Sequence, residues 1–143
     1  MSPEDKIDLL NHLLESEFTA LECYRTHASA ISEPEIADGV KAIIPVEHAH
    51  AVALTTRISE LGGSPVRPGG EASIRGRELA AISRQQGTQA MLKVELGLEQ
   101  EAVKEYAQAV ADIVDDLVTV EMLEEQLLDE MQHAKWLKQQ IIT

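Results

Sequence analysis

The chain has 143 residues and a formal net charge of −13, because 25 acidic residues outnumber 12 Lys and Arg. So few basic groups cannot neutralise a phosphate backbone, which argues against a nucleic-acid partner, whereas an acidic surface attracts cations. The single cysteine cannot form an internal disulfide, and the chain lacks an apolar signal region or a membrane-spanning run. We therefore expect a cytoplasmic protein with no membrane partner.

Apolar residues recur at intervals of three and four, and only 3% of residues are aromatic, which predicts an all-α fold. The first helix starts behind the N-cap residue Ser2, with Pro3 at its first position. The second helix runs from Pro34 to about Leu61. Because the following stretch, 63–77, is rich in glycine and proline, we expect it to be a long crossover loop.

The second half of the chain predicts a further pair of helices. Helical spacing resumes near residue 78, and Gly87 marks a break between a short lead-in and the third long helix. Asp115 or Asp116 caps the fourth helix, which runs to about Gln140. We therefore expect a single domain over 1–143, with two helices in 1–62, the crossover in 63–77 and two helices in 78–143.

Two Glu-x-x-His motifs, at 47–50 and 130–133, are the strongest chemical signal in the sequence. Residues i and i+3 share a helix face, so each motif aims one carboxylate and one imidazole at the same place. In each half, the preceding helix carries a glutamate within an apolar stripe. A shift of 82 or 83 residues superposes the two halves, lone glutamate on lone glutamate and motif on motif. The six candidate metal ligands are Glu17, Glu47, His50, Glu99, Glu130 and His133.

This residue set matches the chemistry of a site for two metal ions. Four carboxylates balance the charge of two divalent cations, and bridging carboxylates offset the repulsion between them. Oxygen-rich ligation with one imidazole per metal suits iron or manganese, and suits zinc less specifically. We assign Glu47 and Glu130 as bridges, with Glu17 and Glu99 as terminal ligands. Four buried carboxylates without cations would be costly, which favours the metal hypothesis over a solvated helix face.

Tyr24 and Tyr106 lie two helical turns after the lone glutamates and are candidate catalytic residues. They can hydrogen-bond to ligand carboxylates across the bundle or act as redox-active side chains, and they can equally be core fillers. Glu95 lies one turn before Glu99 on the same face, so it can replace Glu99 as ligand or line an entry path. The repeat favours Glu99. We expect no ligand role for His12, His27, His48 or Cys23.

The complete pattern resembles the ferritin-like superfamily, and in particular its bacterioferritin and rubrerythrin branches. It consists of Glu17-x-x-Ala-Leu-x-x-Tyr24, its counterpart from Glu99 to Tyr106, and the two Glu-x-x-His motifs. The resemblance covers nearly the whole chain. It implies a four-helix bundle with a long crossover between its second and third helices, and a di-iron centre that reacts with dioxygen or peroxide.

Three functions follow from this resemblance and from the ligand set. The first is an oxidoreductase that oxidises ferrous iron or consumes peroxide. The second is an iron-storage or iron-delivery subunit that acts through assembly. The third is a metal-stabilised bundle that binds partners without turnover. Oxygen consumption on adding ferrous iron separates the first from the third, and particle mass separates the second from both.

Departures from the family pattern set further expectations. His48 stands where bacterioferritins carry a haem-ligating methionine, so no haem is expected. With one cysteine, the chain lacks the paired Cys-x-x-Cys motifs of rubrerythrin electron transfer. No helix is expected after the fourth, so we expect a small homo-oligomer, such as a dimer through the outer faces of the first two helices, and no storage shell.

Overall fold

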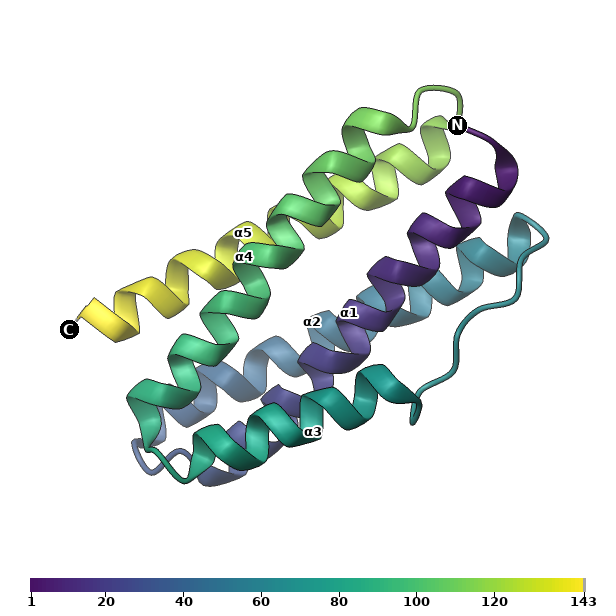
Figure 1. Ribbon diagram of the computed structural model, residues 1–143. Coiled ribbons are helices and arrows are strands. Elements are labelled where there is room, and N and C mark those ends of the chain that lie inside the picture. The colour runs from purple at the N-terminus through teal and green to yellow at the C-terminus, as the bar shows by residue number, and fades with distance from the viewer. Residues whose placement is uncertain (143) are drawn as a thin grey trace.

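A computed structural model describes residues 1–142, which form five helices and no strand (Figure 1). The all-α prediction is confirmed. No helix in the described part of the chain is long and apolar enough to cross a membrane. The helices are α1 (Pro3–Ala30), α2 (Pro34–Glu60), α3 (Glu71–Arg84), α4 (Thr88–Asp112) and α5 (Leu117–Ile142).

Two helical hairpins, α1 with α2 and α4 with α5, make up the bundle (Figure 1). The hairpins meet where α1 packs on α4 and α2 packs on α5, and α3 lies along α1 and also touches α4. At the start of α1, Ser2 Oγ accepts a hydrogen bond of 3.0 Å from the backbone N–H of Asp5. The predicted N-cap is therefore present.

The second part of the crossover is helical, which corrects the prediction of a loop over 63–77 for residues 71–77. α3 begins at Glu71, well before residue 78, and it continues through Gly76. A Cβ atom at Gly76 would lie 2.4 Å from the backbone oxygen of Thr19, so α3 approaches α1 too closely for any side chain there. Thr19 Oγ1 also donates a 2.9 Å hydrogen bond to Ala72 O. The glycine that suggested a loop is needed for close helix packing.

Gly87 separates α3 from α4, as predicted. Its φ of +100° lies in the region that L-residues with a side chain rarely adopt. The chain can therefore turn there within three residues, and α4 starts in a direction of its own instead of continuing α3. The effect is to bring α4 back alongside α1, where it carries Glu99.

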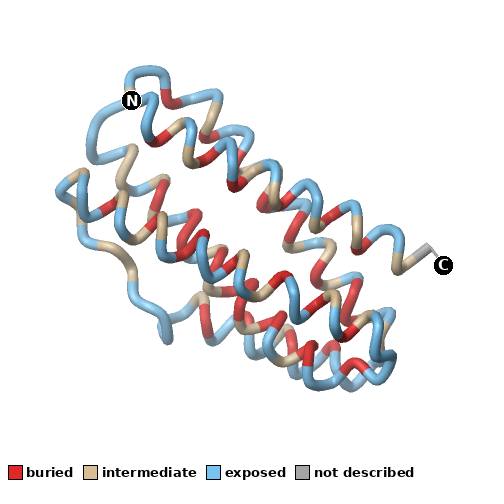
Figure 2. The backbone as a smooth tube through the Cα atoms, turned by 180° about the vertical axis from the view of Figure 1, so that it is seen from behind, coloured by how far each residue is buried: buried red, intermediate tan, exposed pale blue. Residues whose placement is uncertain are grey.

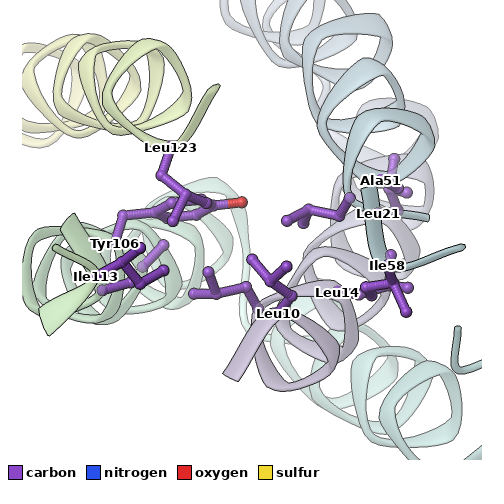
Figure 3. Close-up of a cluster of buried hydrophobic side chains, with 12 residues drawn as sticks. Leu10, Leu14, Leu21, Ala51, Ile58, Tyr106, Ile113 and Leu123 are labelled. Carbon is purple, nitrogen blue, oxygen red and sulfur yellow. The ribbon is translucent and has the colours of Figure 1, made fainter. Parts of the chain in front are cut away.

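The apolar core is divided into two clusters. Buried positions recur along the sides of the helices that face one another (Figure 2). One cluster includes Leu10, Leu54 and Leu123, and it is drawn in Figure 3. The other includes Val40 and Leu92. Between these clusters, α1, α2, α4 and α5 each place at least one buried glutamate. We call this band of acidic side chains the carboxylate layer.

Asp116 is the residue that caps α5, which settles the choice between it and Asp115. Its Oδ1 accepts from the backbone N–H of Thr119 at 3.1 Å, and Arg57 Nη2 donates to Oδ1 and Oδ2 at 2.9 and 3.1 Å. Lys6 Nζ adds a contact of 3.4 Å to Oδ2. Burial works to raise the pKa of Asp116, but the hydrogen bonds from Thr119 and Arg57 outweigh it and hold that pKa well below its usual range. One carboxylate thus ties α1 and α2 to the start of α5.

Replacing Asp116 should reveal its cap and its charge separately. Asp116→Ala removes both and should lower the free energy of unfolding at pH 7 by about 2 kcal/mol. Asp116→Asn keeps an N-cap and should lower it by about 1 kcal/mol. Because the native pKa of Asp116 is depressed, its charge stabilises the fold above the unfolded-state pKa. That stabilisation is lost as the pH falls toward the native pKa.

Urea unfolding at pH 7 and at successively lower pH measures these differences. The matched control is Asp115→Asn, since the Asp115 side chain is 67% exposed and makes only a 3.5 Å contact with Lys6. Equal stability of the Asp115→Asn and Asp116→Asn variants at pH 7 would contradict the assignment.

Candidate metal centre

All six sequence-predicted ligands meet in the carboxylate layer. They form two groups, and within each group one ligand atom per residue lies within 4.8 Å of the others. Glu47 and Glu130 belong to both groups, which is the geometry expected of bridging ligands. The groups are Glu17, Glu47, His50 and Glu130, and Glu47, Glu99, Glu130 and His133.

His50 faces the first group with Nδ1. This atom lies 3.2 Å from Glu130 Oε1, 3.4 Å from Glu17 Oε1 and 3.8 Å from Glu47 Oε1. The opposite nitrogen, Nε2, lies 2.8 Å from Asp129 Oδ2. A carboxylate at one ring nitrogen orients the imidazole and leaves the other nitrogen for a metal. Burial works to lower the pKa of His50, but the carboxylates of Glu130 and Glu17 outweigh it and raise the pKa to about 11.

His133 faces the second group in the same way. Its Nδ1 lies 3.1 Å from Glu47 Oε1, 3.6 Å from Glu99 Oε1 and 3.7 Å from Glu130 Oε1. Burial works to lower the pKa of His133, but the nearby carboxylates of Glu130 and Glu99 raise it to about 9. Each imidazole therefore points one nitrogen at three carboxylates, two of which are shared between the groups.

The two tyrosines hold the terminal glutamates across the bundle. Tyr24 on α1 donates a 2.5 Å hydrogen bond to Glu99 Oε1 on α4, and Tyr106 on α4 donates one of 2.7 Å to Glu17 Oε1 on α1. Figure 3 shows the Tyr106 ring near Leu123, with its hydroxyl oxygen directed away from the helix that carries it. Burial and the adjacent carboxylates raise the pKa of both hydroxyls well above the usual value. The structure contains the expected hydrogen bonds, while a redox role stays a prediction.

The fit of the layer to cations follows from its unsatisfied atoms. Both oxygens of Glu47, Oε2 of Glu17 and Oε2 of Glu99 are buried without a hydrogen-bond partner. Glu130 Oε1 and His133 Nδ1 are also buried without a hydrogen-bond partner. An unsatisfied buried polar atom costs about 1–3 kcal/mol, and a buried charge costs more. Each group offers three carboxylates and one imidazole, a donor set that suits a divalent ion. The residues present therefore fit a pair of metals.

Protons balance the charge of the layer in the absence of metal. Burial, with the charges of Glu17 and Glu99, raises the pKa of Glu47 well above its usual value. Burial also raises the pKa of Glu99, to about 8. Burial opposes ionisation of Glu130, but the imidazoles of His133 and His50 outweigh it and hold its pKa well below the usual range. A metal ion that binds here must therefore displace protons.

Glu95 lies outside both ligand groups, so the structure places Glu99 and not Glu95 among the candidate ligands. The Glu95 carboxylate is fully buried and its Oε2 lies 2.6 Å from His27 Nδ1. Sequence reasoning missed this contact and expected only that His27 is not a ligand. A signal was available: Glu95 breaks an apolar stripe where its repeat counterpart is Leu13, and a buried acid requires a partner.

A cavity of about 570 Å³ reaches the carboxylate layer between α1, α3 and α4. Its wall runs from the exposed residues Lys93, Gly97 and Glu101 to the buried carboxylates. Glu95 is not part of this wall, so the entry-path role considered for it finds no support here. The ligand carboxylates that line the cavity are Glu17, Glu47, Glu99 and Glu130.

Comparison with known proteins agrees with this geometry. The family model described as the ferritin-like domain matches residues 7–143. The chain belongs to the ferritin-like family. No curated protein matches this ferritin-like chain.

Solved structures share the fold. Bacterioferritin from Rhodobacter capsulatus is 27% identical, with a TM-score of 0.77 over 96% of this chain and 84% of that one. The bacterioferritin-related protein of Bacteroides fragilis, a dodecameric thioferritin, is 22% identical, with a TM-score of 0.81 over 97% and 85%. A ferritin-like diiron-carboxylate protein from Bacillus anthracis is 24% identical, with a TM-score of 0.78 over 99% of both chains.

Removing a shared glutamate from this ferritin-like protein should affect both metal positions. We expect Glu47→Ala or Glu130→Ala to reduce the stoichiometry of tightly bound metal from two ions to none, because each carboxylate belongs to both groups. Glu17→Ala should remove one ion and leave the other. Anaerobic titration with Co²⁺ or Fe²⁺ measures the stoichiometry, with the exposed Glu101→Ala as control. Two ions bound at wild-type affinity in either bridging variant would refute the shared-ligand assignment.

Proposed function

We propose that this protein is a di-metal, most simply di-iron, carboxylate protein that oxidises ferrous iron or consumes peroxide or dioxygen. The observation that carries the proposal is the convergence of six ligand side chains into two groups that share two carboxylates. The oxygen-rich donor set favours iron, and manganese or zinc also match part of it. The bacterioferritin and diiron-carboxylate relatives support the same assignment.

Each residue of the layer has a task in this proposal. Glu47 and Glu130 would hold both ions, while Glu17 with His50 and Glu99 with His133 would complete one position each. Tyr24 and Tyr106 hold the terminal carboxylates through hydrogen bonds from the opposite hairpin. When bound, a pair of ferrous ions supplies the two electrons that reduce the oxidant. The apolar clusters on either side pack the helices that carry these residues.

The cavity between α1, α3 and α4 supplies a route for ferrous iron and for the oxidant. Acidic residues dominate its deep end, where four glutamates lie, and the whole chain carries a net charge of −13. A field of this sign draws cations toward the protein. Lys93 and Arg75 belong to the same wall, so the entry is not uniformly acidic.

Assembly is the basis of the second candidate function, iron storage or delivery. The Bacteroides fragilis relative is a dodecamer, which favours a homo-oligomer for this chain as well. The dimer expected through the outer faces of α1 and α2 and a closed dodecamer are the competing states. Light scattering after size exclusion distinguishes them, because storage requires a hollow particle.

Turnover depends on the terminal ligands in this proposal. We expect Glu99→Ala to abolish rapid ferrous oxidation, since one ion then lacks a charged ligand. Glu124→Ala, an exposed glutamate on α5 outside the cavity wall, should leave the rate unchanged. Stopped-flow absorbance at saturating ferrous iron, with dioxygen and with peroxide in turn, is the measurement. Wild-type protein that binds two ions without oxidising them would instead support the metal-stabilised bundle.

Gly97 offers a test of the access route. A Cβ atom at Gly97 meets nothing within 4 Å, so a larger side chain extends into the open cavity without touching a ligand. Gly97→Leu should slow metal loading by about tenfold, while the final stoichiometry stays at two. Gly97→Ala is the matched control, since it adds one methyl group and stabilises a helix by about 1 kcal/mol. Unchanged loading kinetics in the leucine variant would mean that metal enters elsewhere.

A further inference from the structure

A second buried polar cluster lies beside the metal centre. His27 on α1 is fully buried, with Nδ1 2.6 Å from Glu95 Oε2 on α4 and Nε2 2.7 Å from Ser83 Oγ on α3. Glu95 is also fully buried, and Ser83 is 1% exposed. Three helices thus contribute to one hydrogen-bonded chain that includes none of the six candidate ligands.

The hydrogen bonds of Ser83 fix the direction of this chain. The Ser83 hydroxyl donates to the backbone oxygen of Leu79 at 2.8 Å. Its oxygen therefore accepts from His27, which places a hydrogen on Nε2. If the imidazole is neutral, Nδ1 carries a lone pair and the 2.6 Å contact requires the hydrogen on Glu95 Oε2. If the imidazole is charged, the same hydrogen lies on Nδ1. Either way, the pair holds one transferable proton.

The surroundings decide between these two forms. Burial lowers the pKa of His27 to about 4. Burial, with the charge of Glu99, raises the pKa of Glu95 well above its usual value. Both effects favour a neutral imidazole beside a protonated carboxyl. Besides His27, the charge of Glu99 on its own helix acts on Glu95. Glu95 in turn helps to raise the pKa of Cys23 and Tyr24 on α1, where burial is the larger cause, and the pKa of the Cys23 thiol reaches about 12.

The position of Glu95 connects the pair to the centre. Glu95 and Glu99 are one turn apart on the same face of α4, about 6 Å along the helix axis. Glu95 Oε1 is buried without a hydrogen-bond partner, and most other buried atoms of this kind belong to the candidate ligands of the carboxylate layer. A carboxyl group with one bonded and one unbonded oxygen can rotate and present its proton to a new acceptor. The candidate ligands cannot do this once they are bound to metal.

We propose that Glu95, held by His27, is the buried proton donor to the oxidant reduced at the metal centre. The inference rests on the proposed function. Reduction of hydrogen peroxide by two ferrous ions takes up two protons and yields two waters and two ferric ions. Glu95 supplies one of these protons as its O–H bond breaks, and solvent supplies the other through the cavity. A later proton from solvent restores the Glu95–His27 pair.

The decisive variant is Glu95→Gln. A glutamine amide still donates a hydrogen bond to His27 Nδ1, so the geometry is kept while the transferable proton is lost. Positioned general acids contribute about 10²–10⁴-fold, so we expect single-turnover oxidation of pre-bound ferrous iron by peroxide to slow by at least about tenfold. Because burial keeps the wild-type donor protonated, its rate should depend less on pH than the rate of the variant. The rate of the variant should fall as the pH rises.

Ser73→Ala is the matched control. Ser73 is a buried serine on α3 whose hydroxyl accepts from the backbone N–H of Gly69 and takes no part in the Glu95–His27 pair. The variant should lose stability, yet its rate should stay within about twofold of wild type, with the wild-type pH profile. A purely structural role for the cluster predicts that Glu95→Gln behaves like Ser73→Ala, so that stability falls and the pH profile does not change.

Infrared spectroscopy provides a readout that does not depend on turnover. In Zn²⁺-loaded protein, the carbonyl band of a protonated carboxyl should shift in D₂O and disappear in Glu95→Gln. Absence of that difference, or a Glu95→Gln variant with wild-type rate and pH profile, overturns the donor role alone. Wild-type protein that binds two ions but oxidises none refutes the proposed function, and the donor role falls with it.

Discussion

The confinement of four glutamates in one buried layer is the constraint on which this fold depends. Each carboxylate has left water, and burial penalises the charged form. The two imidazoles and the retained protons balance that charge in the absence of metal. Packing of the apolar clusters on either side offsets the free-energy cost of this burial and fixes the helices that carry the acids. Binding of divalent cations at this candidate site would exchange the retained protons for metal ions.

The hairpins are joined through the same layer. Tyr24 and Tyr106 reach in opposite directions across the boundary between α1 and α4, each to the terminal carboxylate of the other hairpin. Far from the layer, Asp116 joins α1, α2 and α5 at the end of the bundle where the chain begins (Figure 1). Polar contacts at the centre and at one end therefore set how the two hairpins align, while apolar packing fills the space between.

The sequence predicted the features that depend on periodicity and charge, and missed those that depend on a neighbouring helix. The two Glu-x-x-His motifs and the lone glutamates could be recognised because they repeat, and the structure brings all six candidate ligands together. The helical crossover was missed because Gly76 looks like a loop residue until α1 is seen against it. The contact between His27 and Glu95 was missed because its members lie far apart in the chain and belong to no repeat.

The two halves of the repeat supply the same types of ligand, but the residues that surround those ligands differ. His50 is oriented by Asp129, whereas the repeat counterpart of Asp129 is Val46, which accepts no hydrogen bond from a ring nitrogen. The repeat counterparts of Glu95 and His27 are the apolar residues Leu13 and Ala109, which cannot form the same hydrogen bond. One imidazole is therefore made more basic by a carboxylate, which strengthens its bond to a cation. The two candidate positions therefore have the same ligand types but different surroundings, and a cation would be held more firmly at the position that contains His50.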